Sequence, residues 1–280
     1  MSTLSTLSSK VFLNLKLDLE WMVNSSVPFF QRAKFFGGKY GSILRNRRSV
    51  GFLGHEFHYD NRLAPALMPD YVKEISELDN SINLSSVSTV LDIGANVGQF
   101  SYTLLSMFPG KRVYSLEPNP EAFSILQKNS EQFLDWNCYQ VGLSDERATL
   151  PFYYVPGKSG QGSLIKENAA LGLLATQVAE IQIELAPLTI EKAGEVGIPT
   201  HFDLVKIDVE GAERQVLNGL SEINWNYLYV ELSLGRDGAL NADEATKILK
   251  KPKPSVECIF QGVPMGPAKT FQAIFRSSKD

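Results

Sequence analysis

One short apolar run, followed by three spaced small or polar residues, constrains the fold of this chain more than any other stretch. Thr89–Ile93 is β-branched and apolar, as a buried parallel strand requires, and Asp92 interrupts it near its carboxyl end. Gly94, Asn96 and Gly98 follow, and large apolar residues then recur at helical spacing until a Pro-Gly pair. The pattern predicts a strand, a glycine turn and a helix, with free backbone N–H groups at the helix start facing a ligand.

The spacing of the glycines separates two classes of cofactor. Dinucleotide-binding turns prefer G-x-G-x-x-G, whereas Asp92–Gly98 reads D-x-G-x-x-x-G. This order resembles motif I of S-adenosylmethionine-dependent methyltransferases, whose cofactor has no pyrophosphate but carries an amino group that a carboxylate attracts. The resemblance implies that Asp92, Gly94, Asn96 and Gly98 bind that cofactor. The glycine spacing also disfavours an NAD-dependent oxidoreductase.

A second acid follows the next predicted strand, Lys111–Leu116. Glu117 comes 25 residues after Asp92, close to the offset of roughly 20 residues at which an acid reaches a ribose in nucleotide-binding units. A carboxylate can accept hydrogen bonds from two vicinal hydroxyls. The loop after the third predicted strand contains Gly142 and Leu143, and we expect it to face the adenine ring.

A charged cluster marks the end of another buried strand. Lys206, Asp208 and Glu210 alternate in the stretch K-I-D-V-E, so they share one face if the chain stays extended. Ligands in open parallel sheets bind at such strand ends. The next strand, Tyr227–Leu232, brings Glu231 to the same edge. Asp208, Glu210 and Glu231 are therefore candidates for a catalytic base, although acids here could instead hold the following turn and cap its helix.

Together, motif I, Glu117 and the run from Lys206 to Glu213, K-I-D-V-E-G-A-E, resemble the FkbM family of S-adenosylmethionine-dependent methyltransferases over roughly residues 85–278. The resemblance implies an α/β fold with a Rossmann-like, seven-stranded class I methyltransferase sheet. It also implies O-methylation of a hydroxyl on a sugar, glycolipid or polyketide-type metabolite. One departure is visible, because many members carry E-x-H after the fifth strand, where this chain has Glu231-Leu-Ser233.

Two alternatives to this function remain open. An N-methyltransferase acting on an amine would need less help from a base. A nucleotide-binding or scaffold protein would have kept the fold and lost catalysis. No metal site is predicted from the pattern, and metal dependence stays open because clustered carboxylates could hold Mg²⁺ or act alone.

The 280 residues, 44% of them hydrophobic, can bury a sizeable core. We predict a helical N-terminal extension over residues 1–84, forming a cap over the acceptor pocket, and a methyltransferase domain over residues 85–280. Residues 1–50 carry eight Lys and Arg against two acids, whereas the whole chain has a net charge of −4. The basic segment is either the solvated face of this cap or a peripheral contact with a membrane or another anionic surface. The acidic remainder disfavours nucleic acid as a partner.

Several weaker patterns give further expectations. The early stretch Val11–Val23 contains three charged residues, which is too many for a membrane span or a signal-peptide core, so a cytoplasmic location is predicted. Cys138 and Cys258 lack metal-ligand spacing and are expected to be buried. His55–His58 is expected in a surface loop or at an edge that contacts the substrate. Pro156–Ser163 is rich in glycine and is either a mobile loop or a hairpin connection.

Overall fold

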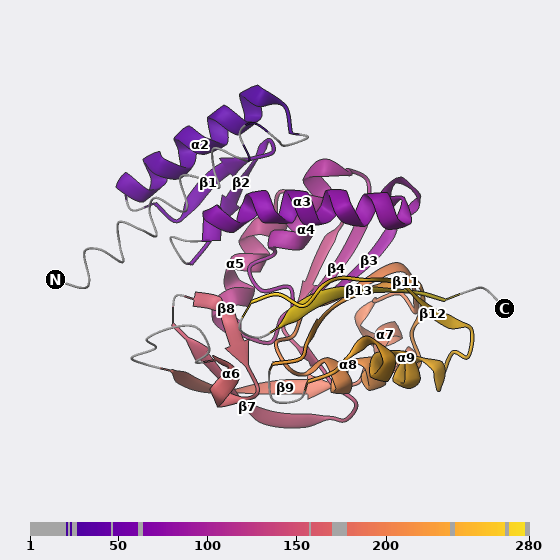
Figure 1. The fold of residues 1–280 in the computed structure, drawn as a ribbon. Coiled ribbons are helices and arrows are strands. Elements are labelled where there is room, and N and C mark those ends of the chain that lie inside the picture. The colour runs from indigo at the N-terminus through magenta and orange to yellow at the C-terminus, as the bar shows by residue number, and fades with distance from the viewer. Residues whose placement is uncertain are drawn as a thin grey trace.

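The computed structural model describes residues 21, 23, 27–45, 47–60, 64–156, 158–169, 178–235, 239–266 and 269–277. The elements within these residues are shown in Figure 1. Their bounds in chain order are α2 Phe29–Leu44, β1 Ser49–Phe52, β2 His55–His58, α3 Ala64–Ile82, η1 Leu84–Ser86, β3 Thr89–Ile93, α4 Gln99–Met107, β4 Arg112–Leu116, α5 Pro120–Ser130, β5 Trp136–Tyr139, β6 Gly142–Leu143, β7 Ala148–Val155, β8 Lys158–Ser163, α6 Lys166–Ala169, β9 Ala179–Ala186, α7 Ile190–Val196, β10 His201–Ile207, α8 Glu213–Gly219, β11 Asn224–Ser233, α9 Ala242–Lys250, β12 Val256–Gln261 and β13 Thr270–Ser277.

The main sheet confirms the predicted seven-stranded α/β fold. Its strand order is β12-β13-β11-β10-β3-β4-β5. The strands β11, β10, β3, β4 and β5 run parallel, and β13 is antiparallel to both of its neighbours. The chain turns to one side of β3 for β4 and to the other side for β10. In such sheets a crevice opens at the carboxyl ends of the strands where the order reverses.

Helices cover both faces of this sheet. In Figure 1, α3 and α4 lie above the strands, whereas α7, α8 and α9 lie below them. The first group, with α5, packs into one hydrophobic core and the second group into another. All five residues of β3 are buried, which explains why the sequence of that strand is apolar without alternation.

A second sheet, of order β6-β9-β7-β8, is formed by residues 142–186. It corrects the expectation for Pro156–Ser163, because Lys158–Ser163 forms the strand β8. Gly162 explains why this stretch is rich in glycine: a Cβ there would lie 2.3 Å from the ring of Phe152. The glycine therefore lets β8 pack closely against β7.

The N-terminal region contains strands as well as the expected helices. β1 and β2 form an antiparallel hairpin, and its turn residues Leu53 and Gly54 both have positive φ. His55–His58 therefore forms a strand and not a surface loop, and the alternative expectation, an edge that contacts the substrate, stays a prediction. Asn129 of α5 holds the open edge of β2, since its side chain accepts from His58 N at 2.7 Å and donates to His58 O at 2.9 Å.

This hairpin and α3 belong to the same core as the upper face of the main sheet. Phe52 and Phe57 are buried beside Tyr102 of α4, and α3 packs Met68 and Ile75 into the same cluster. The predicted division of the chain after residue 84 remains a prediction. Among the described segments, no helix combines the length and apolar character that a membrane span requires.

The two cysteines are free thiols with different exposure. Cys138 on β5 is partly buried. Cys258 is exposed, which differs from the predicted burial, because β12 is the edge strand of the main sheet.

Candidate active site

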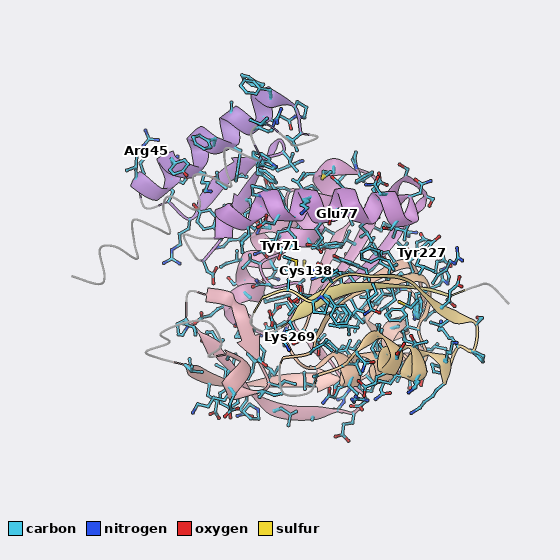
Figure 2. All side chains as sticks on the ribbon, in the orientation of Figure 1. Arg45, Tyr71, Glu77, Cys138, Tyr227 and Lys269 are labelled. Carbon is cyan, nitrogen blue, oxygen red and sulfur yellow. The ribbon has the colours of Figure 1, made fainter. Side chains whose placement is uncertain are left out.

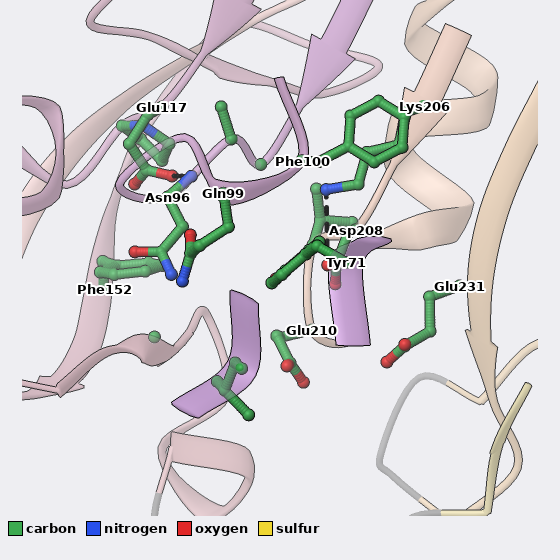
Figure 3. Close-up of a pocket in the computed structure, with 16 residues that line it drawn as sticks. Tyr71, Asn96, Gln99, Phe100, Glu117, Phe152, Lys206, Asp208, Glu210 and Glu231 are labelled. Atoms are coloured by element: carbon green, nitrogen blue, oxygen red, sulfur yellow. Dashed lines mark hydrogen bonds and ion pairs between the residues drawn. The ribbon is translucent and has the colours of Figure 1, made fainter. Parts of the chain in front are cut away.

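A cavity of about 280 Å³ lies at the carboxyl ends of the parallel strands. Its walls come from the β3–α4 turn, the ends of β4, β10 and β11, the helix α3 and the second sheet. Figure 3 shows Glu117 and Asn96 on one side of it and Glu231 on the other. The residues that line it are Leu67, Tyr71, Gly94, Ala95, Asn96, Gln99, Phe100, Glu117, Pro118, Phe152, Gly162, Lys206, Asp208, Val209, Glu210 and Glu231.

The glycines of the first motif are required mainly by contacts within the protein. Gly94 has a φ of 76°, and a Cβ on it would lie 1.9 Å from the carbonyl oxygen of Asp208. Gly98 has a φ of 91° and faces Trp136 and Leu126, each within 2.8 Å of such a Cβ. Gly94 also lines the cavity, whereas Gly98 does not. The predicted approach of the backbone to a ligand thus fits Gly94 and not Gly98.

Asp92 lies behind the cavity wall and is not among the residues that line it, so its contact with the cofactor stays a prediction. It is fully buried, accepts a hydrogen bond from Ser101 Oγ at 2.6 Å and lies 3.3 Å from Lys206 Nζ. A buried carboxylate needs such partners, because an unpaired charge in the interior is strongly disfavoured. Asp92 therefore supports the site by holding Lys206.

Glu117 joins the first two motifs through its carboxylate. Oε2 accepts from Asn96 N and Oε1 accepts from Asn119 N, both at 2.8 Å. Burial raises the pKa of Glu117 to about 7, although the two backbone donors oppose the shift. The side-chain Oδ1 of Asn96, also at the cavity, has no hydrogen-bond partner among the described residues.

The three candidate bases meet at the other side of the cavity, as predicted. Asp208, Glu210 and Glu231 each place a carboxylate oxygen within 4.8 Å of the others. β10 ends at Ile207, and Glu210 has a φ of 52°, so the chain turns before it reaches Glu210. The predicted shared face of an extended strand therefore holds for Lys206 and Asp208, whereas a turn brings Glu210 to the cavity.

Lys206 forms ion pairs with Asp92 and Asp208, which sets Asp208 apart from Glu231. Its Nζ lies 3.3 Å from Asp92 and 3.4 Å from Asp208. Although burial disfavours an ammonium, these two carboxylates raise the pKa of Lys206, so it stays charged. Glu231 instead accepts a long hydrogen bond, 3.4 Å, from Gln272 Nε2. Burial, with the nearby Asp208 and Glu74 carboxylates, raises the pKa of Glu231 to about 8.

Gly142 and Leu143, predicted to face adenine, lie beside the main cavity. They line a hollow of about 40 Å³ that shares Gly94 and Pro118 with it, and a further hollow of about 390 Å³ that Leu188 lines with them. Gly142 is needed here for packing, because a Cβ on it would lie 2.3 Å from Leu185 of β9. The second sheet therefore closes this end of the site.

The match that decides the family covers the strands just described. The family model described as the methyltransferase FkbM domain matches residues 92–251. This chain belongs to the FkbM methyltransferase family. The match spans β3 to α9 and includes the residues predicted from sequence to form the site.

Curated relatives agree with the FkbM assignment. Methyltransferase 1 of Beauveria bassiana is 29% identical over 154 residues, which cover 50% of this chain and 61% of that protein. The 31-O-demethyl-FK506 methyltransferase FkbM of Streptomyces tacrolimicus is 27% identical over 170 residues, covering 53% and 65%. The hexuronic acid methyltransferase AglP of Haloferax volcanii is 27% identical over 169 residues, covering 59% and 63%. The chain thus spans less than two thirds of the length of these relatives.

Among solved structures, the magnesium protoporphyrin IX methyltransferase ChlM of Synechocystis PCC 6803, crystallised with S-adenosylmethionine, is similar with a TM-score of 0.47. The two sequences are 12% identical, and the alignment covers 91% of this chain and 100% of that one.

Some residues of the cavity were not predicted from the FkbM motifs. Leu67 and Tyr71 come from α3, and Phe152 comes from β7. Figure 2 shows Tyr71 on the sheet side of α3. The sequence predicted a helical extension over residues 1–84, but it contained no signal for which side chains of α3 or β7 would reach the site.

The basic segment before the FkbM match exposes large apolar side chains. Phe29, Phe30 and Leu44 of α2 are 66%, 79% and 86% exposed, and the neighbouring Arg45 is also exposed. Figure 2 shows Arg45 at the end of α2, away from the main sheet. The contact with an anionic surface stays a prediction, which co-sedimentation with anionic phospholipid vesicles would test against neutral vesicles.

Proposed function

We propose that this protein is an S-adenosylmethionine-dependent O-methyltransferase acting on a hydroxyl of a sugar, glycolipid or polyketide-type metabolite. One observation carries the proposal: a single cavity joins the motif that members of this family use for the cofactor to a cluster of carboxylates able to receive a proton. The family match supports the methyl transfer. The activities for which the FK506 and hexuronic acid methyltransferases are named support a hydroxyl-bearing acceptor.

The residues on the Glu117 side fit the cofactor. Glu117 uses one acceptor position on each oxygen for a backbone N–H, and each oxygen has further capacity for a ribose hydroxyl. The unpaired Oδ1 of Asn96 offers another acceptor at the same wall. When bound, the cofactor supplies a methyl group on a sulfonium, which is already a good leaving group.

The residues on the Glu231 side fit the removal of a proton. Asp208 lies 3.4 Å from Lys206 Nζ at this side of the cavity, where its carboxylate can accept the proton of an acceptor hydroxyl. Glu231, with a pKa of about 8, is mainly protonated at neutral pH and can donate a hydrogen bond that orients the acceptor. A base of this kind accelerates a reaction by about 10²–10⁴-fold, and alignment of the reacting atoms contributes as well.

Calorimetry with S-adenosylmethionine tests the proposal. At pH 8, above the Glu117 pKa of about 7, Glu117→Gln should weaken binding by roughly 1.5–3 kcal/mol, since the bond to a charged acceptor is lost. Glu121→Gln is the matched control, because Glu121 is exposed on the next helix and does not line the cavity. Equal affinity of folded Glu117→Gln and wild type, or no binding by wild type, would refute the assignment.

A further inference from the structure

The helix α3 lies outside the FkbM match yet forms one wall of the cavity. The match begins at residue 92, whereas Leu67 and Tyr71 of α3 line the cavity. These two residues are four positions apart, so they lie one above the other on the same face of the helix. Figure 3 shows the Tyr71 ring across the middle of the cavity, between Asn96 and Glu231.

The position of this wall is fixed by contacts on both sides of Tyr71. Met68, Val72 and Ile75 are buried in the core above the sheet. One turn after Tyr71, the Glu74 carboxylate makes a hydrogen bond with the phenol of Tyr229 on β11. Burial raises the pKa of Glu74 to about 7, although the residue keeps part of its surface exposed. The helix is therefore held against the strand that carries Glu231.

Tyr71 lines the cavity together with Lys206 and Glu231, which come from two neighbouring strands of the sheet. Lys206 is paired with Asp92 on one side and with Tyr229 on the other. Two residues further along β11, on the same face, Glu231 reaches the cavity. Burial and the nearby Asp208 carboxylate raise the pKa of Tyr71 well above its usual value, so the phenol keeps its proton and remains a donor.

An apolar wall beside a cluster of carboxylates suits one kind of methyl acceptor better than others. A pyranose ring has an apolar C–H face and a rim of hydroxyls. The C–H face matches the ring of Tyr71 and the side chain of Leu67, and the hydroxyls match acceptor oxygens such as those of Glu210 and Glu231. A flat phenol or an alkyl alcohol brings fewer hydroxyls than a pyranose and would make fewer hydrogen bonds to these oxygens.

We propose that Tyr71 is a specificity-determining residue that contacts the methyl-accepting substrate. Its ring stacks on a saccharide, and its hydroxyl donates a hydrogen bond to an oxygen of that saccharide beside Asp208. The inference rests on the proposed function and narrows its acceptor to a saccharide unit. It assigns to α3 a direct part in substrate recognition.

A binding experiment that needs no cofactor tests the wall itself. Saturation-transfer NMR on the protein without added cofactor should detect binding of methyl glucoside or methyl glucuronoside. The signals from catechol and octanol should be weaker. Tyr71→Ala should weaken glycoside binding by roughly two- to ten-fold, the range for aromatic contacts. Tyr227→Phe is the control, because Tyr227 lies on the same face of β11 but outside the cavity.

Activity assays separate contact from folding. With S-adenosylmethionine and a methylated glycoside as product, Tyr71→Ala should raise KM about ten-fold while kcat changes less. Tyr71→Phe should keep the KM and lower kcat. Leu67→Ala provides a second variant that should still fold, because Leu67 is 48% exposed. Urea midpoints and cofactor affinity should match wild type for Tyr71→Phe and Leu67→Ala.

The outcomes also separate this inference from the proposed function. If S-adenosylmethionine binds and phenols or alkyl alcohols are methylated in preference to glycosides, the saccharide assignment is wrong and the methyltransferase stands. If glycosides bind and Tyr71→Ala, Tyr71→Phe and Leu67→Ala leave their affinity and KM unchanged, Tyr71 is not a recognition residue. If glycosides bind through Tyr71 but S-adenosylmethionine does not bind, the proposed function fails and the saccharide site stands.

Discussion

The two sides of the cavity are built in different ways. The Glu117 side consists of two short turns joined by backbone N–H groups: Asn96 N donates to the Glu117 carboxylate, and Gly94 N donates to Leu116 O. The Glu231 side gathers side chains from α3, β10 and β11, which lie far apart in the sequence. The first side depends on close backbone packing, and the second on charges and rings held in place by other elements. Variants on the two sides should therefore fail for different reasons.

The largest effect is expected from Gly94→Ala, which should destabilise the fold itself. The added Cβ would lie 1.9 Å from the Asp208 carbonyl oxygen, so the ends of β3 and β10 must move apart. We expect a loss of about 3 kcal/mol in the free energy of unfolding, from overpacking added to a strained φ. Gly110→Ala is a matched control with a φ of 86° and no atom within 4 Å, and it should lose about 1 kcal/mol. Equal losses in urea unfolding would show that close approach is not what requires Gly94.

On the Glu231 side, Asp208→Asn should leave the fold and cofactor affinity near normal and lower turnover at least about 10²-fold. Glu231→Gln should lose much less at pH 7, because an amide resembles the protonated acid. This variant should also lack the change in rate that wild type shows near the Glu231 pKa of about 8.

Steady-state pH profiles of the two variants, with the exposed Asp135→Asn as control, check this assignment. Normal turnover of Asp208→Asn would make Asp208 a structural residue. A loss in Glu231→Gln as large as in Asp208→Asn at pH 7 would instead make Glu231 the base.

The sequence predicted the Glu117 side better than the other because its contacts are local or follow from strand order. The strand ends and the turn follow from a parallel sheet whose order could be inferred from motif resemblance. On the other side, only the meeting of Asp208, Glu210 and Glu231 followed in the same way. Gly98 shows the limit of that reasoning: a glycine needed for packing against Trp136 has the same pattern as one needed for a ligand.

The α3 side was not predicted, because its contacts join distant parts of the chain. The sequence predicted a helical extension here, but the rotation of α3 that sends Tyr71 to the cavity and Glu74 to Tyr229 depends on packing against β11. The hairpin is a similar case, since Asn129 meets β2 across 71 residues of sequence. No local pattern encodes either contact.

The smallest effect concerns stability and pH, and it tests whether α3 is held by a buried glutamate. The pKa of Glu74 is raised to about 7, so between its usual value of 4.5 and 7 the folded state binds a proton that the unfolded state has released. Stability therefore falls as pH rises through this window, by on the order of 1 kcal/mol. Glu74→Gln should flatten that slope in urea midpoints measured from pH 4.5 to 7.5, without removing the part contributed by Glu117. Glu77→Gln, exposed one turn away, should keep the wild-type slope; if Glu74→Gln keeps it too, the carboxylate is not desolvated against Tyr229 and α3 is held by its apolar face alone.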